Sequence, residues 1–158
     1  WGKFSLIFFL LLMFIGGCAG STACGIKIFR LQMLLLFLKN QIKKLISPNS
    51  VIITKYNNQK ISDNFINSVI IFIFTFLFIF LIIAMLLSIS GLDFITSISG
   101  AASAISNVGP GLGDIIGPNG NYKDIPNLSK WILSFGMLLG RLELFAVLVL
   151  FFPSFWRN

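Results

Sequence analysis

The longest uninterrupted apolar segment of the chain, residues 65–87, contains no charged residue, no proline and no glycine. As an α-helix rising roughly 1.5 Å per residue it would be about 35 Å long, enough to cross the hydrocarbon core of a bilayer with some tilt. Charged residues make up only 11% of the chain, whereas soluble domains contain about 25%. The sequence therefore predicts an integral membrane protein, and residues 65–87 are its clearest spanning helix.

A second long apolar segment, residues 128–152, is also predicted to span the membrane. Trp131 lies near its start and residues 155–156 (Phe-Trp) follow its end, as aromatic residues commonly do at membrane interfaces. Unlike residues 65–87, this segment contains charges, Arg141 and Glu143, near its middle. A charge at that depth usually faces a cavity or a partner, so both residues are candidates for function.

A third spanning helix is predicted at residues 26–46, with Lys27 and Arg30 near its outer end. These two cations are most simply expected to extend toward the membrane interface. The sequence Ser-Pro-Asn-Ser at 47–50 ends the helix, and residues 51–62 are predicted to form a short polar loop with one strand.

Two further apolar segments, residues 4–15 and 94–106, are too short to cross a bilayer. Each leads into a glycine-rich turn, GGCAGST at 16–22 and NVGPGLG at 107–113. Asp93 is placed to cap the second short helix. The chain thus shows the same order twice: a short apolar helix, a glycine-rich turn and a longer helix.

The distribution of charge predicts the orientation. The chain carries a net charge of +7, and all 5 acidic residues follow residue 60. The lysines of the loop at 39–60 place this loop in the cytoplasm, because short loops rich in Lys and Arg stay inside. Both glycine-rich turns then fall on the outer side of the membrane. Nucleic-acid binding is not expected, because these lysines interrupt membrane-spanning sequence.

Irregular backbone at membrane depth is tolerated where protein buries it or where it lines a watery path. A short helix leading into glycine-rich backbone is the arrangement of cation filters, in which carbonyl oxygens replace the water around the ion. Ordinary surface loops are the alternative, because Gly, Pro, Asn and Ser also mark turns. The candidate filter residues are Cys18, Ala19, Gly20 and Ser21 in the first turn and Asn107, Val108, Gly109 and Pro110 in the second.

Three segments resemble the Trk/Ktr/HKT potassium transporter superfamily, and most closely its bacterial Trk-type membrane subunit. The segment GGCAGSTACGIK at 16–27 is similar to the third pore loop of that family, and NVGPGLG at 107–113 to the fourth. The segment GRLELF at 140–145 is similar to its last helix. One departure is Cys24, where the family is expected to have glycine.

The resemblance implies an all-α integral membrane fold of helix–pore-helix–helix repeats with re-entrant pore loops. Residues 1–46 would be the second half of a third repeat, 47–62 a cytoplasmic loop and 63–158 a fourth repeat. The chain begins at Trp1 within apolar sequence, and we interpret it as a fragment of a longer protein. The family further implies a homodimer, a cytosolic nucleotide-binding regulatory subunit on the inner face, and a bacterial inner membrane crossed several times.

The resemblance also supports a role for Arg141 beside the ion path below the filter, as a barrier to cations. A structural salt bridge to another helix is the alternative, and it is the simpler interpretation for Glu143. Lys39, Lys43 and Lys44 are expected to contact anionic lipid headgroups.

Enzymatic activity is not predicted, because the chain contains no histidine and no nucleophile paired with a base. No cofactor is expected, and potassium would be the transported ion. The leading hypothesis is potassium uptake. Two others stay open at this point: a broken-helix secondary transporter for another solute, and a membrane anchor protein that transports nothing.

Overall fold

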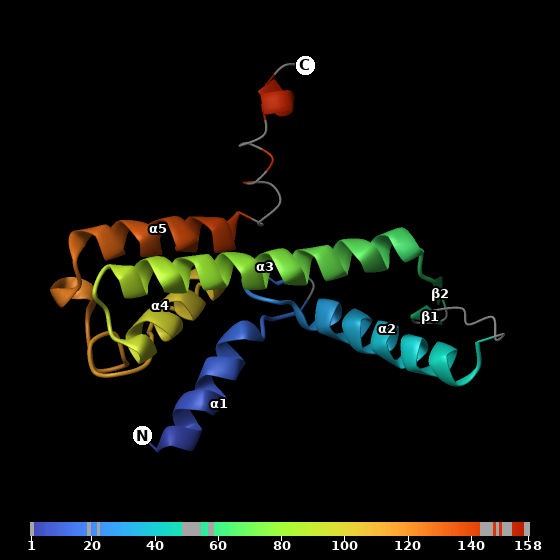
Figure 1. Cartoon of the computed structure of the whole chain (residues 1–158), viewed down its shortest axis with the longest axis horizontal. Helices are drawn as coiled ribbons and strands as arrows, with labels where there is room; N and C mark the ends of the chain where they lie inside the picture. Colours follow the sequence, from blue (N-terminus) through green and yellow to red (C-terminus); the bar gives the residue numbers. More distant parts are fainter. Residues whose placement is uncertain are drawn as a thin grey trace.

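The computed structural model describes residues 2–18, 20–21, 23–48, 55–56, 59–142, 147, 149 and 153–156. Within them the regular secondary structure is helical apart from one short hairpin (Figure 1). The helices are α1 (Lys3–Phe14), α2 (Ile28–Ile46), α3 (Asp63–Ile89), α4 (Phe94–Ser106) and α5 (Asn127–Arg141), with 3₁₀ turns η1 (Tyr122–Asp124) and η2 (Pro153–Trp156). The hairpin pairs β1 (Lys55–Tyr56) with β2 (Gln59–Lys60), where one strand was expected.

Helix α3 is the axis of the fold: α2 lies against its N-terminal half, and α4 and α5 lie against its C-terminal half (Figure 1). Among the described helices it alone is both long and apolar enough to cross a membrane. One stripe of α3 is buried, and it includes Phe72, Phe76, Ile79, Ile83 and Leu87. The opposite side exposes large apolar side chains, as a lipid-facing helix does.

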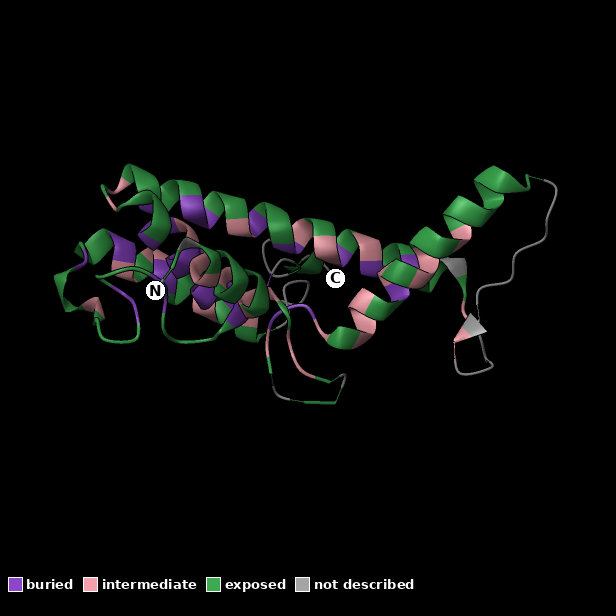
Figure 2. Ribbon diagram, turned by 90° about the horizontal axis from the view of Figure 1, so that it is seen from below, coloured by how far each residue is buried: buried purple, intermediate pink, exposed green. Residues whose placement is uncertain are grey.

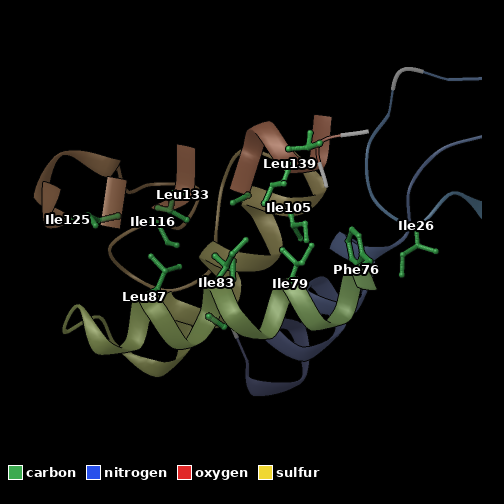
Figure 3. Packing of buried hydrophobic residues seen from close by; sticks show 14 of the residues in the cluster. Ile26, Phe76, Ile79, Ile83, Leu87, Ile105, Ile116, Ile125, Leu133 and Leu139 are labelled. Carbon is green, nitrogen blue, oxygen red and sulfur yellow. The ribbon is translucent and has the colours of Figure 1, made fainter. Parts of the chain in front are cut away.

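Helix α4 has the bounds that the sequence predicts, and it is almost entirely enclosed by the other helices. It is built from small residues, with Ala101, Ala102 and Ala104 fully buried. Small side chains allow helices in a membrane to approach closely. Figure 3 shows Ile105 of α4 packed among Leu139 of α5 and the α3 stripe. Burial is concentrated where these helices meet, and the far end of α2 is exposed (Figure 2).

The position of α2 differs from the prediction. The Arg30 guanidinium lies 3.7 Å from the centre of the Phe72 ring, and the Phe29 and Phe65 rings are 5.8 Å apart. The start of α2 therefore lies beside the first turns of α3, not at the opposite end of that helix. Helix α2 is also not among the helices that could cross a membrane, because it contains too many charged residues. The expected extension of Arg30 toward an outer interface is wrong, because its half-buried side chain is stacked on the ring of Phe72.

Two helix ends also differ from expectation. Asp93 occupies the cap position of α4, but its side chain makes no capping hydrogen bond; its backbone oxygen accepts from Ser97 N at 2.8 Å. Helix α5 ends at Arg141, short of the continuous helix expected over 128–152, and residues 143–146, 148 and 150–152 lie outside the described part. The end of α3 agrees with the sequence, because Gly91 follows it with φ +90°.

Candidate functional site

The second glycine-rich turn begins at a fixed point on α4. Asn107 ends the helix in the left-handed conformation, with φ 53° and ψ 43°. Its side-chain Nδ2 donates a hydrogen bond to the backbone oxygen of Met137 on α5, at 3.0 Å. The backbone N–H of Val108 donates to Ser103 O at 3.0 Å, which closes the helix end. The turn is thus attached to both α4 and α5 where it starts.

From Val108 the chain runs back along α4 toward the start of that helix. Ser103 Oγ donates to the backbone oxygen of Gly109 at 2.9 Å. One helical turn earlier, Ser99 Oγ donates to Leu112 O at 3.1 Å and accepts from Leu112 N at 2.9 Å. Because Ser99 and Ser103 lie four residues apart, they occupy one face of α4 and hold two points of the extended segment.

Tyr122 of η1 adds a third attachment. Its hydroxyl donates to the same Gly109 oxygen at 2.6 Å. Burial raises the pKa of the Tyr122 hydroxyl above its usual value of 10.0, and the neighbouring Ser103 hydroxyl offsets part of that rise. The hydroxyl therefore stays protonated at neutral pH and remains a donor. Gly109 itself has φ +109°, a conformation that side chains other than glycine rarely adopt.

The first glycine-rich turn is built differently. After α1 the chain forms a parallel bridge between Ile15 and Ile26. Gly16 N donates to Ile26 O at 2.9 Å, and a β-carbon on Gly16 would meet the backbone oxygen of Cys24. Ser21 N donates to Cys18 O at 3.0 Å, so a tight turn closes the loop. Of the first candidate filter, Cys18, Gly20 and Ser21 are exposed and Ala19 lies outside the described residues.

A cavity of about 460 Å³ brings the two turns together, and we call it the inter-turn cavity. Its lining includes Asn107, Val108 and Pro110 of the second candidate filter. The first turn contributes the residues that flank its candidate filter, Gly16, Gly17, Ala23 and Cys24, instead of Cys18 to Ser21. The structure therefore places both turns at one cavity, and the second turn contributes three of its four predicted residues, without Gly109.

Arg141 lies at the end of α5, close to the first turn. Its Nη1 is 3.8 Å from Cys24 Sγ. It lines a separate pocket of about 270 Å³ together with Lys27 and Arg30, and we call this the basic pocket. Glu143, the other charged candidate on this segment, lies outside the described residues.

Sequence reasoning missed the polar side chains that hold the second turn. Ser99, Ser103 and Tyr122 were not predicted to contribute, although the four-residue spacing of the two serines in an apolar helix was a usable signal. The buried hydroxyl of Ser106 was also missed. It lines the inter-turn cavity and has no hydrogen-bond partner among the described residues.

We predict that Ser99→Ala destabilises the turn. Removal of the hydroxyl leaves the N–H and C=O of Leu112 without their partner in a buried place, at a cost of about 1–3 kcal/mol for each unsatisfied group. The measurement is thermal unfolding of the purified full-length protein. Ser106→Ala is the matched control, because that hydroxyl makes no hydrogen bond within the described part of the chain. Equal melting temperatures for the two variants would contradict the role of Ser99.

Similarity to known proteins shows which family the chain belongs to. The family model of TrkH, described as a cation transport protein, matches residues 1–158. The chain belongs to the TrkH family. It is 48% identical over 158 residues to the Trk system potassium uptake protein TrkI of Halomonas elongata, covering 100% of this chain and 32% of that protein. It is 34% identical over 158 residues to the Trk system potassium uptake protein TrkH of Escherichia coli K12, again covering 32% of the relative.

A solved structure supports the same relationship. The crystal structure of the potassium transporter TrkH from Vibrio parahaemolyticus matches with a TM-score of 0.88 and 33% identity, covering 99% of this chain and 33% of that chain. The chain therefore spans about a third of the length of the TrkH-family relatives it matches. The family resemblance and the all-α membrane fold predicted from sequence are confirmed. The family is one of transport proteins, in agreement with the prediction that the chain is not an enzyme.

Proposed function

We propose that this chain is the C-terminal part of the pore subunit of a potassium uptake protein in a bacterial inner membrane, which it crosses several times. The relatives named as Trk system potassium uptake proteins support this function. The observation that carries it is the second turn, where extended backbone runs antiparallel to a half-length helix and is held by Ser99, Ser103 and Tyr122. Backbone that is held at Gly109 and Leu112 in this way can present its other carbonyl groups in place of the hydration shell of a cation.

Within this proposal the repeats keep the boundaries given by the sequence. Residues 1–46 provide the pore helix, filter turn and following helix of one repeat, 47–62 the cytoplasmic loop, and 63–158 a complete further repeat. The filter consists of Cys18, Ala19, Gly20 and Ser21 with Asn107, Val108, Gly109 and Pro110. The shared inter-turn cavity supports the pairing of the two turns at one ion path.

Arg141 is proposed to act as the barrier on this path. Its position beside Cys24 places a positive charge next to the segment that follows the first filter turn. Lys27 and Arg30 line the same pocket and add to the local positive potential. A cation leaving the filter would meet this field before it reached the cytoplasm.

The relatives are named as proteins of a Trk system, which supports an assembly of more than one component. We propose that the full-length protein forms a homodimer and binds a cytosolic nucleotide-binding regulatory subunit on its inner face. The exposed C-terminal part of α2, with Lys39, Lys43 and Lys44, supports contact with anionic lipid headgroups at that face.

The test is complementation of a potassium-uptake-deficient bacterium by the full-length protein that contains this chain. We expect growth at low external potassium and uptake of rubidium that potassium inhibits. A broken-helix transporter of another solute would show uptake of that solute without rescue, and an anchor protein would show neither. Absence of rescue by protein shown to be inserted in the membrane would contradict the proposal.

A further inference from the structure

One peptide group of the second turn can be held only through its oxygen. Pro110 has no backbone N–H, so the Gly109 carbonyl is the sole hydrogen-bonding group of the peptide that joins these two residues. Its oxygen accepts two hydrogen bonds, from Ser103 Oγ at 2.9 Å and from the Tyr122 hydroxyl at 2.6 Å. Because a carbonyl oxygen has two lone pairs, these donors engage both and direct the group toward α4 and η1.

The neighbouring carbonyl groups are placed differently. Within the described part of the chain, no group donates a hydrogen bond to the backbone oxygens of Asn107, Val108 or Pro110. The same three residues line the inter-turn cavity, whereas Gly109 is not among its lining residues. The second turn thus has one carbonyl group that the protein holds and three that remain available to an ion.

Tyr122 is itself fixed by its surroundings, so its hydroxyl is presented at a definite place. It begins the turn η1, in which Lys123 N donates to Asn121 Oδ1 at 2.9 Å. The side chain of Lys130, in the first turn of α5, donates to Lys123 O at 2.8 Å. Through Tyr122 the Gly109 oxygen is therefore connected to α5 as well as to α4.

We propose that Tyr122 is a positioning residue for ion selectivity: it holds the Gly109 carbonyl, and the three neighbouring carbonyls thereby keep a fixed spacing around the ion. This inference rests on the proposed function of the second turn as part of a potassium filter. Selectivity in such a filter depends on the space between the carbonyl oxygens and on their number. With one donor removed, the peptide at Gly109 rotates more easily, because glycine permits backbone conformations that other residues resist. The spacing is then less well fixed, and sodium is excluded less effectively.

The test is Tyr122→Phe in the full-length protein, which keeps the aromatic ring and removes only the hydroxyl. The measurement is rubidium uptake by vesicles, with the sodium concentration and the potassium concentration that each halve it. The ratio of these two concentrations should fall about two- to tenfold, the range that corresponds to one hydrogen bond of ordinary net strength. A purely structural role would lower the amount of inserted protein and leave the ratio unchanged, because the ratio does not depend on that amount.

Tyr56→Phe is the matched control. It also removes one hydrogen-bonded tyrosine hydroxyl, the donor to Gln32 Oε1 at 3.0 Å, but it does so in the hairpin and not at the second turn. This variant should keep the wild-type ratio. Ser103→Ala removes the other donor to the Gly109 oxygen and should lower the ratio as Tyr122→Phe does.

The possible failures are distinguishable. A wild-type ratio in membrane-inserted Tyr122→Phe would overturn the role of Tyr122 and leave the proposed function intact, and so would an equal loss of discrimination in Tyr56→Phe. If Tyr122→Phe does not insert, an unchanged ratio in Ser103→Ala overturns the proposal instead. Equal inhibition by sodium and potassium in the wild-type protein would contradict the potassium filter itself, and this inference with it.

Discussion

Gly140→Ala is expected to eliminate most of the folded, transport-competent full-length protein. Gly140 lies in the last turn of α5 and faces the end of α4. A β-carbon there would meet the backbone oxygen of Ile105, and it would lie 2.8 Å from the Ile105 carbonyl carbon and 2.7 Å from Asn107 Nδ2. Backbone atoms cannot rotate away, so α5 would have to move outward. Overpacking of a core costs about 1–3 kcal/mol and more where backbone shifts.

The same movement would break the hydrogen bond from Asn107 Nδ2 to Met137 O that positions the second turn. The measurements are the amount of membrane-inserted protein and its thermal unfolding. Gly136→Ala, one turn earlier on α5, is the control, because its β-carbon would meet only side-chain atoms, Ile83 Cδ1 at 3.1 Å and Ala104 Cβ at 3.2 Å. Equal amounts of inserted protein and equal unfolding temperatures for the two variants would contradict the close approach of α4 and α5.

Arg141→Ala is expected to increase potassium flux per inserted molecule about tenfold or more. At an effective dielectric constant of about 20, two unit charges about 7 Å apart repel each other by roughly 2.4 kcal/mol. Each 1.4 kcal/mol removed from a barrier corresponds to about a tenfold change in rate. Lys27 and Arg30 stay in the basic pocket, so part of the positive potential persists and the barrier is lowered without being abolished.

The measurement is rubidium uptake by vesicles, normalised to the amount of inserted protein. Arg141→Lys separates charge from shape, and it should keep flux near the wild-type value because the positive charge remains. If Arg141 instead forms a structural bridge, Arg141→Ala should reduce protein abundance with no gain per molecule. A normalised flux at or below wild type would remove Arg141 from the barrier.

The helices around the second turn could be predicted well from sequence because local signals agree there. The bounds of α4 match the prediction, and α3 extends the predicted 65–87 by only a few residues at each end. In α3 an apolar segment without Gly or Pro is ended by Gly91, whose φ of +90° favours glycine. The start and end of these two helices depend on residues that are close in the sequence, and tertiary contacts do not change them.

The position of α2 and the make-up of the basic pocket could not be predicted in this way. The apolar pattern of residues 26–46 shows that a helix forms, but its depth is set by contacts such as Arg30 on Phe72 and Tyr56 OH with Gln32 Oε1 at 3.0 Å. These pairs are far apart in sequence. The close approach of Cys24 and Arg141 is likewise a tertiary contact that spacing does not encode.

Gly109 and Gly91 both have a positive φ, but only Gly109 lies in the proposed filter. Serine at each position therefore allows the most direct test of the filter assignment. Gly109 has φ +109° and Gly91 has φ +90°, and an added β-carbon at either would have no atom of the described residues within 4 Å except those of its chain neighbours. Serine at either place therefore introduces a similar backbone strain of about 1–2 kcal/mol without a clash.

Only Gly109 belongs to the segment that we propose to coordinate potassium. The measurement is the potassium concentration for half-maximal uptake, together with the discrimination against sodium, in the full-length protein. We predict that Gly109→Ser raises that concentration about tenfold or lowers the discrimination, and that Gly91→Ser changes neither. Wild-type affinity and wild-type discrimination in Gly109→Ser would contradict the assignment of residues 107–110 as a potassium filter.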